Sequence, residues 1–81
     1  MAAREENERK FGYWNESKDG RRTYWYEVKG KYGWVARYVK VVDENEDTIL
    51  FKQEIYNDKN ELVEVHQKFP IDTGHQKLHK N

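Results

Sequence analysis

The run WVARYVKVVD at residues 34–43 constrains the fold more than any other part of the chain. It is the most apolar stretch and is rich in β-branched and aromatic residues. Gly33 precedes it and an acidic segment follows it. This composition is typical of a buried β-strand bounded by turns. We therefore expect a central strand here, with the other elements arranged around it.

Turn residues divide the rest of the chain into short segments that alternate apolar and polar positions. The turn sequences are SKDG, GKYG, ENE and NDKN, and each provides a residue suited to the left-handed conformation. Short strands joined by short turns pair with their neighbours. The prediction is an all-β fold, a five-stranded antiparallel meander, with strands at residues 10–16, 21–29, 34–43, 48–56 and 61–69.

The ends of the chain carry few apolar residues. We expect residues 1–9 to be a polar, flexible N-terminus and residues 71–81 to be a polar, flexible tail, on either side of one β domain at 10–70. No segment shows a convincing helical stripe, so no helix is expected to cover the sheet.

Strand register follows if each turn is a three-residue loop closed by its left-handed residue. This geometry places Trp25 opposite Val39, Val39 opposite Phe51, and Gln53 opposite Val65. It also aligns Glu27, Arg37 and Gln53 side by side. One face then collects most of the large apolar side chains: Phe11, Tyr13, Trp25, Val35, Val39, Val41, Ile49, Phe51, Ile55, Val63, Val65 and Phe69.

Such an apolar face needs a cover, since each exposed large side chain forgoes about 1.5–3 kcal/mol of burial. With no helix expected, two solutions remain. The sheet could curl into a partial barrel with this face inside, or two copies could pack as a sandwich through self-association. We favour self-association and leave both architectures open.

Charge and cysteine content limit the partners and the compartment. The chain has 15 Lys and Arg, 15 Asp and Glu, and no cysteine. Zero net charge argues against a general polyanion binder, although residues 1–40 carry ten basic and six acidic residues while 41–81 carry five and nine. No disulfide is available, and no membrane-spanning or secretory segment is evident. We expect a cytoplasmic protein with no membrane partner.

The second face of the predicted sheet carries the favoured binding site. It combines aromatic rings with a cation, at Trp14, Tyr24, Tyr26, Tyr38 and Lys40. Tyr and Trp are favoured anchors of protein interfaces, and rings beside cations also suit single-stranded nucleic acid. Because net charge is zero, we predict a small non-enzymatic binding module that contacts a protein partner, with a single-stranded nucleic-acid binder as an alternative.

A second alternative is a small endoribonuclease. The predicted register places His66 opposite Lys52 and Glu54 opposite Glu64, a set that resembles those of small sheet-based ribonucleases of the toxin-like kind. Cross-strand pairs of Lys, Glu and His are also ordinary on any solvated sheet. Whether the chain is an enzyme stays open at this point, and the favoured expectation is that it is not.

Two patterns resemble metal sites without meeting their requirements. The spacing of Asp43, Asn45 and Asp47 is similar to a calcium loop, but Thr48 stands where that loop needs glycine. His75 and His79 are four residues apart, but the adjoining glutamate of a zinc helix is missing. We predict no metal and no cofactor.

Overall fold

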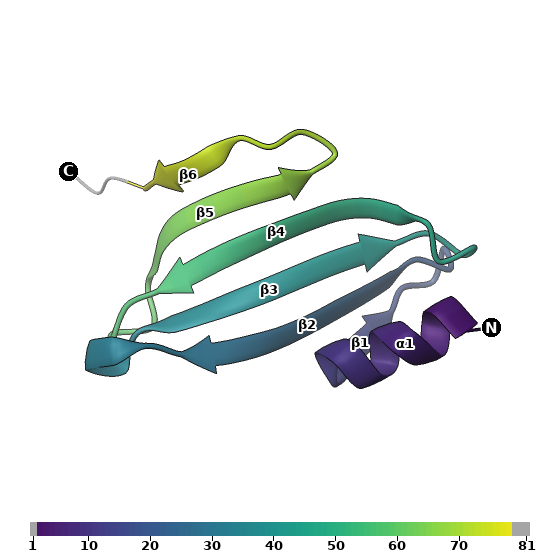
Figure 1. Cartoon of the computed structure of the whole chain (residues 1–81), viewed down its shortest axis with the longest axis horizontal. Helices are drawn as coiled ribbons and strands as arrows, with labels where there is room; N and C mark the ends of the chain where they lie inside the picture. The colour runs from purple at the N-terminus through teal and green to yellow at the C-terminus, as the bar shows by residue number, and fades with distance from the viewer. Residues whose placement is uncertain (1, 79–81) are drawn as a thin grey trace.

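The computed structural model describes residues 2–78, which form an open antiparallel sheet of six strands with one α-helix against one side (Figure 1). The strand order across the sheet is the chain order, so the predicted meander is confirmed. The elements are α1 (Ala2–Phe11), β1 (Tyr13–Glu16), β2 (Arg22–Lys29), a 3-10 turn (Lys31–Gly33), β3 (Val35–Val42), β4 (Thr48–Tyr56), β5 (Leu62–Phe69) and β6 (Gly74–Lys77).

Two features of the predicted architecture are wrong. The sheet has six strands rather than five, because Gly74–Lys77 in the predicted tail pairs with β5 as β6. The sheet also does not close into a barrel, since β1 and β6 form its two opposite edges.

Helix α1 replaces the first part of the strand predicted at residues 10–16, which begins instead at Tyr13. Glu5 in its first turn and Arg9 and Lys10 in its last turn complement the helix dipole. The helix ends at Phe11, and Gly12 follows it with a φ of +86°, the usual conformation of the residue that terminates a helix.

The side of α1 that faces the sheet carries Arg4, Asn7, Glu8 and Phe11, which have helical spacing. Three of these four side chains are polar, so the helix has no apolar stripe that periodicity could detect. Its only large apolar contact is Phe11, which is buried against Tyr24. The expectation that no helix is present therefore failed because this helix docks mainly through polar groups.

The four predicted tight turns are confirmed. The residue that closes each loop has a positive φ, at Gly20, Gly33, Glu46 and Asn60. Glycine is the usual residue in this conformation, and Asn and other residues adopt it where a turn demands it. Strands β2 to β5 accordingly begin and end within one residue of their predicted limits.

The register between β2 and β3 is the predicted one, with Trp25 opposite Val39 and Glu27 opposite Arg37. Between β3 and β4 the prediction holds only next to the turn. Val42 pairs with Thr48, but Val41 pairs with Leu50, which leaves one extra residue in β4. Because side chains alternate with a period of two, this bulge moves every later side chain of β4 to the opposite face.

The predicted pairs beyond that bulge are therefore wrong. Val39 lies opposite Lys52 rather than Phe51, and Arg37 lies opposite Glu54 rather than Gln53. A second irregularity between Ile55 and Tyr56 places Gln53 opposite His66 rather than Val65. The predicted single apolar face is thus divided between the two sides of the sheet.

Candidate binding surfaces

The sheet has two unlike sides. The helix-covered face includes Tyr24, Tyr26, Tyr38, Lys40 and Phe51, which are matched across β2, β3 and β4 and lie on the side of Phe11. The helix-free face includes their sequence neighbours, and its central side chains are Trp25, Arg37, Val39, Lys52 and Glu54. In Figure 1, α1 lies beside β1 and β2 and leaves β5 and β6 uncovered.

A buried carboxylate connects α1 to the sheet. The side chain of Glu46, in the β3–β4 turn, is only 2% exposed. Its Oε2 accepts hydrogen bonds from the Tyr24 hydroxyl at 2.8 Å and the Asn7 amide at 3.1 Å, and its Oε1 accepts one from Arg4 Nε at 3.2 Å. Three elements distant in sequence therefore meet at one acidic group.

The ionisation of this junction follows from its surroundings. Burial by itself would raise the pKa of Glu46, but the hydrogen bonds from Asn7, Tyr24 and Arg4 outweigh it and hold the pKa below its ordinary value. Burial and the nearby carboxylate raise the pKa of the Tyr24 hydroxyl. Glu46 is thus charged and Tyr24 neutral at neutral pH, which is the state that the hydrogen bonds require.

A second polar contact joins α1 to β1 and β2. Arg22 on β2 forms ion pairs with Glu8 of α1 at 2.6 Å and with Glu16 of β1 at 3.1 Å. Its guanidinium also lies 5.8 Å from the ring centre of Trp14 and 5.7 Å from that of Tyr24. Burial by itself would lower the pKa of Arg22, but its hydrogen bonds to Glu8 and Glu16 raise that pKa above its ordinary value.

The sequence-predicted aromatic site is brought together on the helix-covered face, but α1 occupies part of it. Tyr24 is fully buried against Phe11, and Lys40 donates a hydrogen bond to Asn7 at 3.0 Å. Tyr26 and Tyr38 stack on each other, with ring centres 4.8 Å apart. Trp14 stays exposed beside Arg22. Much of this aromatic group therefore forms the core between helix and sheet, and its binding role stays a prediction.

The four residues of the ribonuclease alternative do not form one site. His66 lies opposite Gln53 and Glu64 opposite Ile55, on the helix-covered side of the sheet. Lys52 and Glu54 lie on the helix-free face, where their charged ends form an ion pair at 3.0 Å. The irregularity between Ile55 and Tyr56 in the β4–β5 pairing is what separates the two pairs.

Sequence reasoning missed the partners of His66 that β6 and the loop before it provide. His66 Nε2 lies 2.7 Å from Asp72 Oδ1, and its ring centre lies 4.4 Å from that of His75. His75 in turn lies 3.4 Å from a Glu64 carboxylate oxygen. The amide of Gly74 and then His66 lower the pKa of Asp72. These contacts help to hold the edge strand, and only the pairing of β6 with β5 reveals them.

The acidic turn that resembled a calcium loop uses its first carboxylate internally. Asp43 Oδ1 accepts hydrogen bonds from the backbone amides of Asn45 at 2.8 Å and Asp47 at 3.0 Å. This arrangement stabilises the turn, as Asp side chains commonly do. Within residues 2–78, no three His, Asp or Glu side chains are grouped so that they could hold a metal ion.

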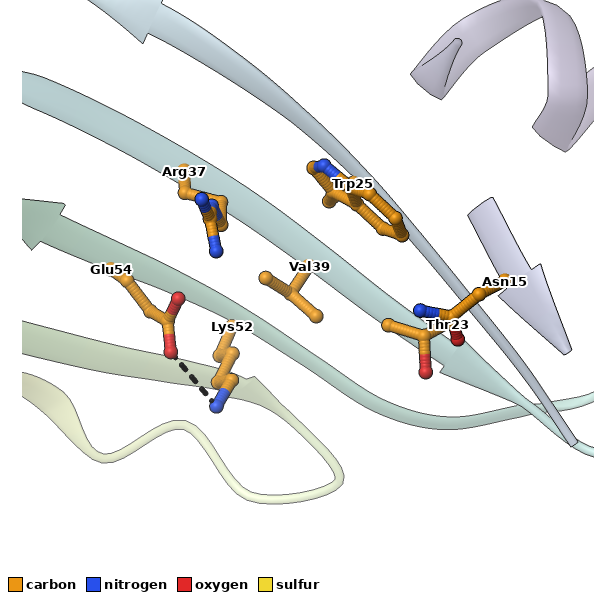
Figure 2. Close-up of a pocket in the computed structure, with 7 residues that line it drawn as sticks. All are labelled: Asn15, Thr23, Trp25, Arg37, Val39, Lys52 and Glu54. Carbon is orange, nitrogen blue, oxygen red and sulfur yellow. Dashed lines mark ion pairs between the residues drawn. The ribbon is translucent and has the colours of Figure 1, made fainter. Parts of the chain in front are cut away.

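The helix-free face contains a hollow of about 330 Å³ that sequence reasoning did not predict. Figure 2 shows the seven side chains that line it, which come from four adjacent strands: Asn15, Thr23, Trp25, Arg37, Val39, Lys52 and Glu54. Trp25 and Val39 provide its apolar part, and the Lys52–Glu54 ion pair lies at one side (Figure 2). Nothing in the sequence indicated this hollow, because Lys52 and Glu54 reach this face only through the β4 bulge.

Aromatic and charged pairs surround this hollow. Tyr13 stacks on Trp25 with ring centres 6.0 Å apart, and 62% of Tyr13 remains exposed. Arg37 donates two hydrogen bonds to one carboxylate oxygen of Glu27, at 2.8 and 3.0 Å, and lies over the ring of Tyr56. The hydrogen bonds to Glu27 raise the pKa of Arg37 despite partial burial. An apolar centre with charged pairs around it is the arrangement found in protein interfaces.

Comparison with known proteins adds no relative: no protein-family model, no curated protein and no solved structure matches this chain. Among the described residues, no helix combines the length and the apolar character that crossing a bilayer requires. Function is therefore inferred from the geometry of the residues themselves.

Proposed function

We propose that the chain is a non-enzymatic protein-interaction module whose helix-free face packs against a second copy of itself. The observation that carries this proposal is the one-sided cover. Helix α1 protects one face, while the other presents the stacked Tyr13 and Trp25 with no element of the described chain above them. Large aromatic side chains in such a position are frequent anchors of protein interfaces.

The apolar neighbours on this face support a sandwich. Val35, Val39, Val41 and Leu50 lie on the same side as Trp25, and all except Val39 keep partial exposure. The outline of the molecule, 43 by 24 Å, is large enough for the roughly 800 Å² that each partner buries in a stable interface. Two such faces packed together would remove these side chains from water in both copies.

Charge distribution favours one orientation of the two copies. Strands β1 to β3 come mainly from the half of the chain with net charge +4, ten basic minus six acidic residues, and β4 to β6 come from the half with −4, five minus nine. A two-fold axis parallel to the strands places the positive half over the partner's negative half. An axis across the strands would place like charges together, which is unfavourable.

Sedimentation velocity over a concentration series tests the proposal, with Tyr13→Lys as the disrupting variant. We expect wild type to form dimers that weaken as salt rises, and Tyr13→Lys to raise the dimer dissociation constant at least about tenfold. Tyr32→Lys is the matched control, since Tyr32 is 87% exposed in the turn between β2 and β3. A wild type that stays monomeric at every concentration, or equal loss of dimer in both variants, would contradict it.

A further inference from the structure

A second hollow, of about 310 Å³, lies on the helix-covered face between the end of α1 and strands β3 to β5. Its apolar part consists of three phenylalanine rings, of which Phe11 is buried, Phe51 is half-buried and Phe69 is exposed. Phe11 and Phe51 meet edge to face, with ring centres 6.4 Å apart. Their arrangement leaves an aromatic wall open to solvent on one side.

Lysine side chains surround these rings. Lys10 and Lys40 line the hollow, and Lys10 Nζ lies 5.8 Å from the ring centre of Phe11. Lys68 approaches from β5, with its Nζ 5.7 Å from the ring centre of Phe51 and 5.4 Å from that of Tyr38. Three ammonium groups from a helix and two strands therefore gather around one aromatic surface.

None of these three lysines forms an ion pair with a carboxylate of residues 2–78. The most informative is Lys40, because it is half-buried in a central strand and its Nζ has Asn7 Oδ1, a neutral acceptor, at 3.0 Å. By contrast, Lys52 on the adjacent strand and the opposite face is neutralised by Glu54 at 3.0 Å. A partly buried ammonium with only a neutral acceptor is well suited to an anion from outside the chain.

We propose that this hollow binds a small amphipathic anion, a carboxylate or phosphate attached to an aromatic ring. The ring lies against Phe51 and Phe69, and the anionic group accepts charge-assisted hydrogen bonds from Lys40 and Lys10. The volume is at the lower end of the range of small-molecule sites, which restricts the ligand to about one ring and its acidic group. This site is independent of the proposed interface, since the two lie on opposite faces.

An NMR titration of the labelled full chain tests this site with four probes. Phenyl phosphate and 3-phenylpropionate carry both features, 3-phenylpropanol carries only the ring, and inorganic phosphate carries only the charge. We expect saturable shifts of the amides around Lys40, Phe51 and Phe69 with the two aromatic anions. The aromatic anion that binds more tightly identifies the preferred acidic group. Both 3-phenylpropanol and inorganic phosphate should bind at least about tenfold more weakly than that anion.

Two variants with the same chemical change provide the matched comparison. Lys40→Met should raise the dissociation constant of the more tightly bound aromatic anion about tenfold, whereas Lys52→Met should leave that constant unchanged. Phe69→Ala, at an exposed wall of the hollow, weakens binding without touching the charge and covers the case in which Lys40→Met does not fold.

Several results would overturn the proposal. These are shifts that do not saturate, equal affinity for 3-phenylpropanol, or equal weakening by Lys40→Met and Lys52→Met. A single-stranded oligonucleotide that shifts the same amides while the aromatic anions do not would also overturn it, in favour of nucleic-acid stacking on this face.

Discussion

The two faces of the sheet bury polar groups in different ways. On the helix-covered face, Tyr24, Val42 and Phe11 form the buried cluster, and the charges of Glu46 and Arg22 are enclosed and supplied with partners. On the helix-free face the Arg37–Glu27 ion pair is largely exposed, Tyr13 is exposed and Trp25 is only partly buried. The difference shows that one ten-residue helix decides which side of this sheet becomes the interior.

Polar contacts rather than apolar ones give that helix its place. Arg4 and Asn7 bind Glu46, and Glu8 binds Arg22, whereas Phe11 alone adds a large apolar contact. Such buried charges stabilise the fold only while every partner is present, since an unpaired buried charge is costly. The comparison of the faces can therefore be tested by equivalent substitutions on each side.

The largest expected difference in stability is between variants at two neighbouring aromatic residues of β2. Tyr24→Ala removes a fully buried ring and should lower the free energy of unfolding by about 3–5 kcal/mol. Trp25→Ala, on the helix-free face, should cost about 1–2 kcal/mol because its ring is only partly buried. Urea unfolding measures both. Equal losses would mean that α1 does not make its face the interior.

Arginine substitutions compare the ion pairs of the two faces. Arg22→Met leaves Glu8 without its partner beneath the helix, and should cost about 2 kcal/mol because the Arg22 side chain is only 11% exposed. Arg37→Met removes an ion pair whose side chains are 39% and 45% exposed, and should cost at most about 1 kcal/mol. The same unfolding experiment checks both. A larger loss for Arg37→Met would reverse the comparison.

Acid should weaken the helix-covered face through Glu46. Its pKa in the folded chain is lower than the ordinary value of 4.5, so its contribution is present above that value and lost as pH falls through the folded pKa. Glu46→Gln should cost about 1–2 kcal/mol at neutral pH and flatten the loss of stability that wild type shows as pH falls below 4.5. Thermal unfolding at a series of pH values measures this.

Glu44→Gln is the control for that experiment, because Glu44 is an exposed residue of the same turn. It should leave both the stability and its pH dependence unchanged. If the two variants reduce the loss of stability at acid pH to the same degree, Glu46 is not the source of the pH dependence.

The smallest expected effect concerns β6, at the edge that α1 does not cover. Asp72→Asn removes the carboxylate that lies 2.7 Å from His66, so the amides of β6 should exchange with solvent about threefold faster. Because Asp72 is an exposed residue of the loop that leads to the edge strand, the unfolding midpoint should not change measurably. Hydrogen exchange resolved by residue distinguishes this local opening from global destabilisation, which would contradict the assignment.

The aromatic site shows how far prediction from sequence could reach. Trp14, Tyr24, Tyr26, Tyr38 and Lys40 do share a face, as alternation along the first three strands predicts. The burial of Tyr24 could not be predicted, because it depends on a helix whose inner side is mostly polar. The hollow in Figure 2 was equally hidden, since Lys52 and Glu54 reach it only after an extra residue in β4.

Short-range sequence patterns were enough to predict the strands from β2 to β5, the tight turns and the meander order, because each depends on residues that are close together in the chain. Tertiary structure decided which face the side chains of β4 occupy, since one extra residue reverses a period of two. It also decided the position of α1, because Arg4 and Asn7 share one side of the helix and both bind Glu46, which lies about 40 residues later in the chain.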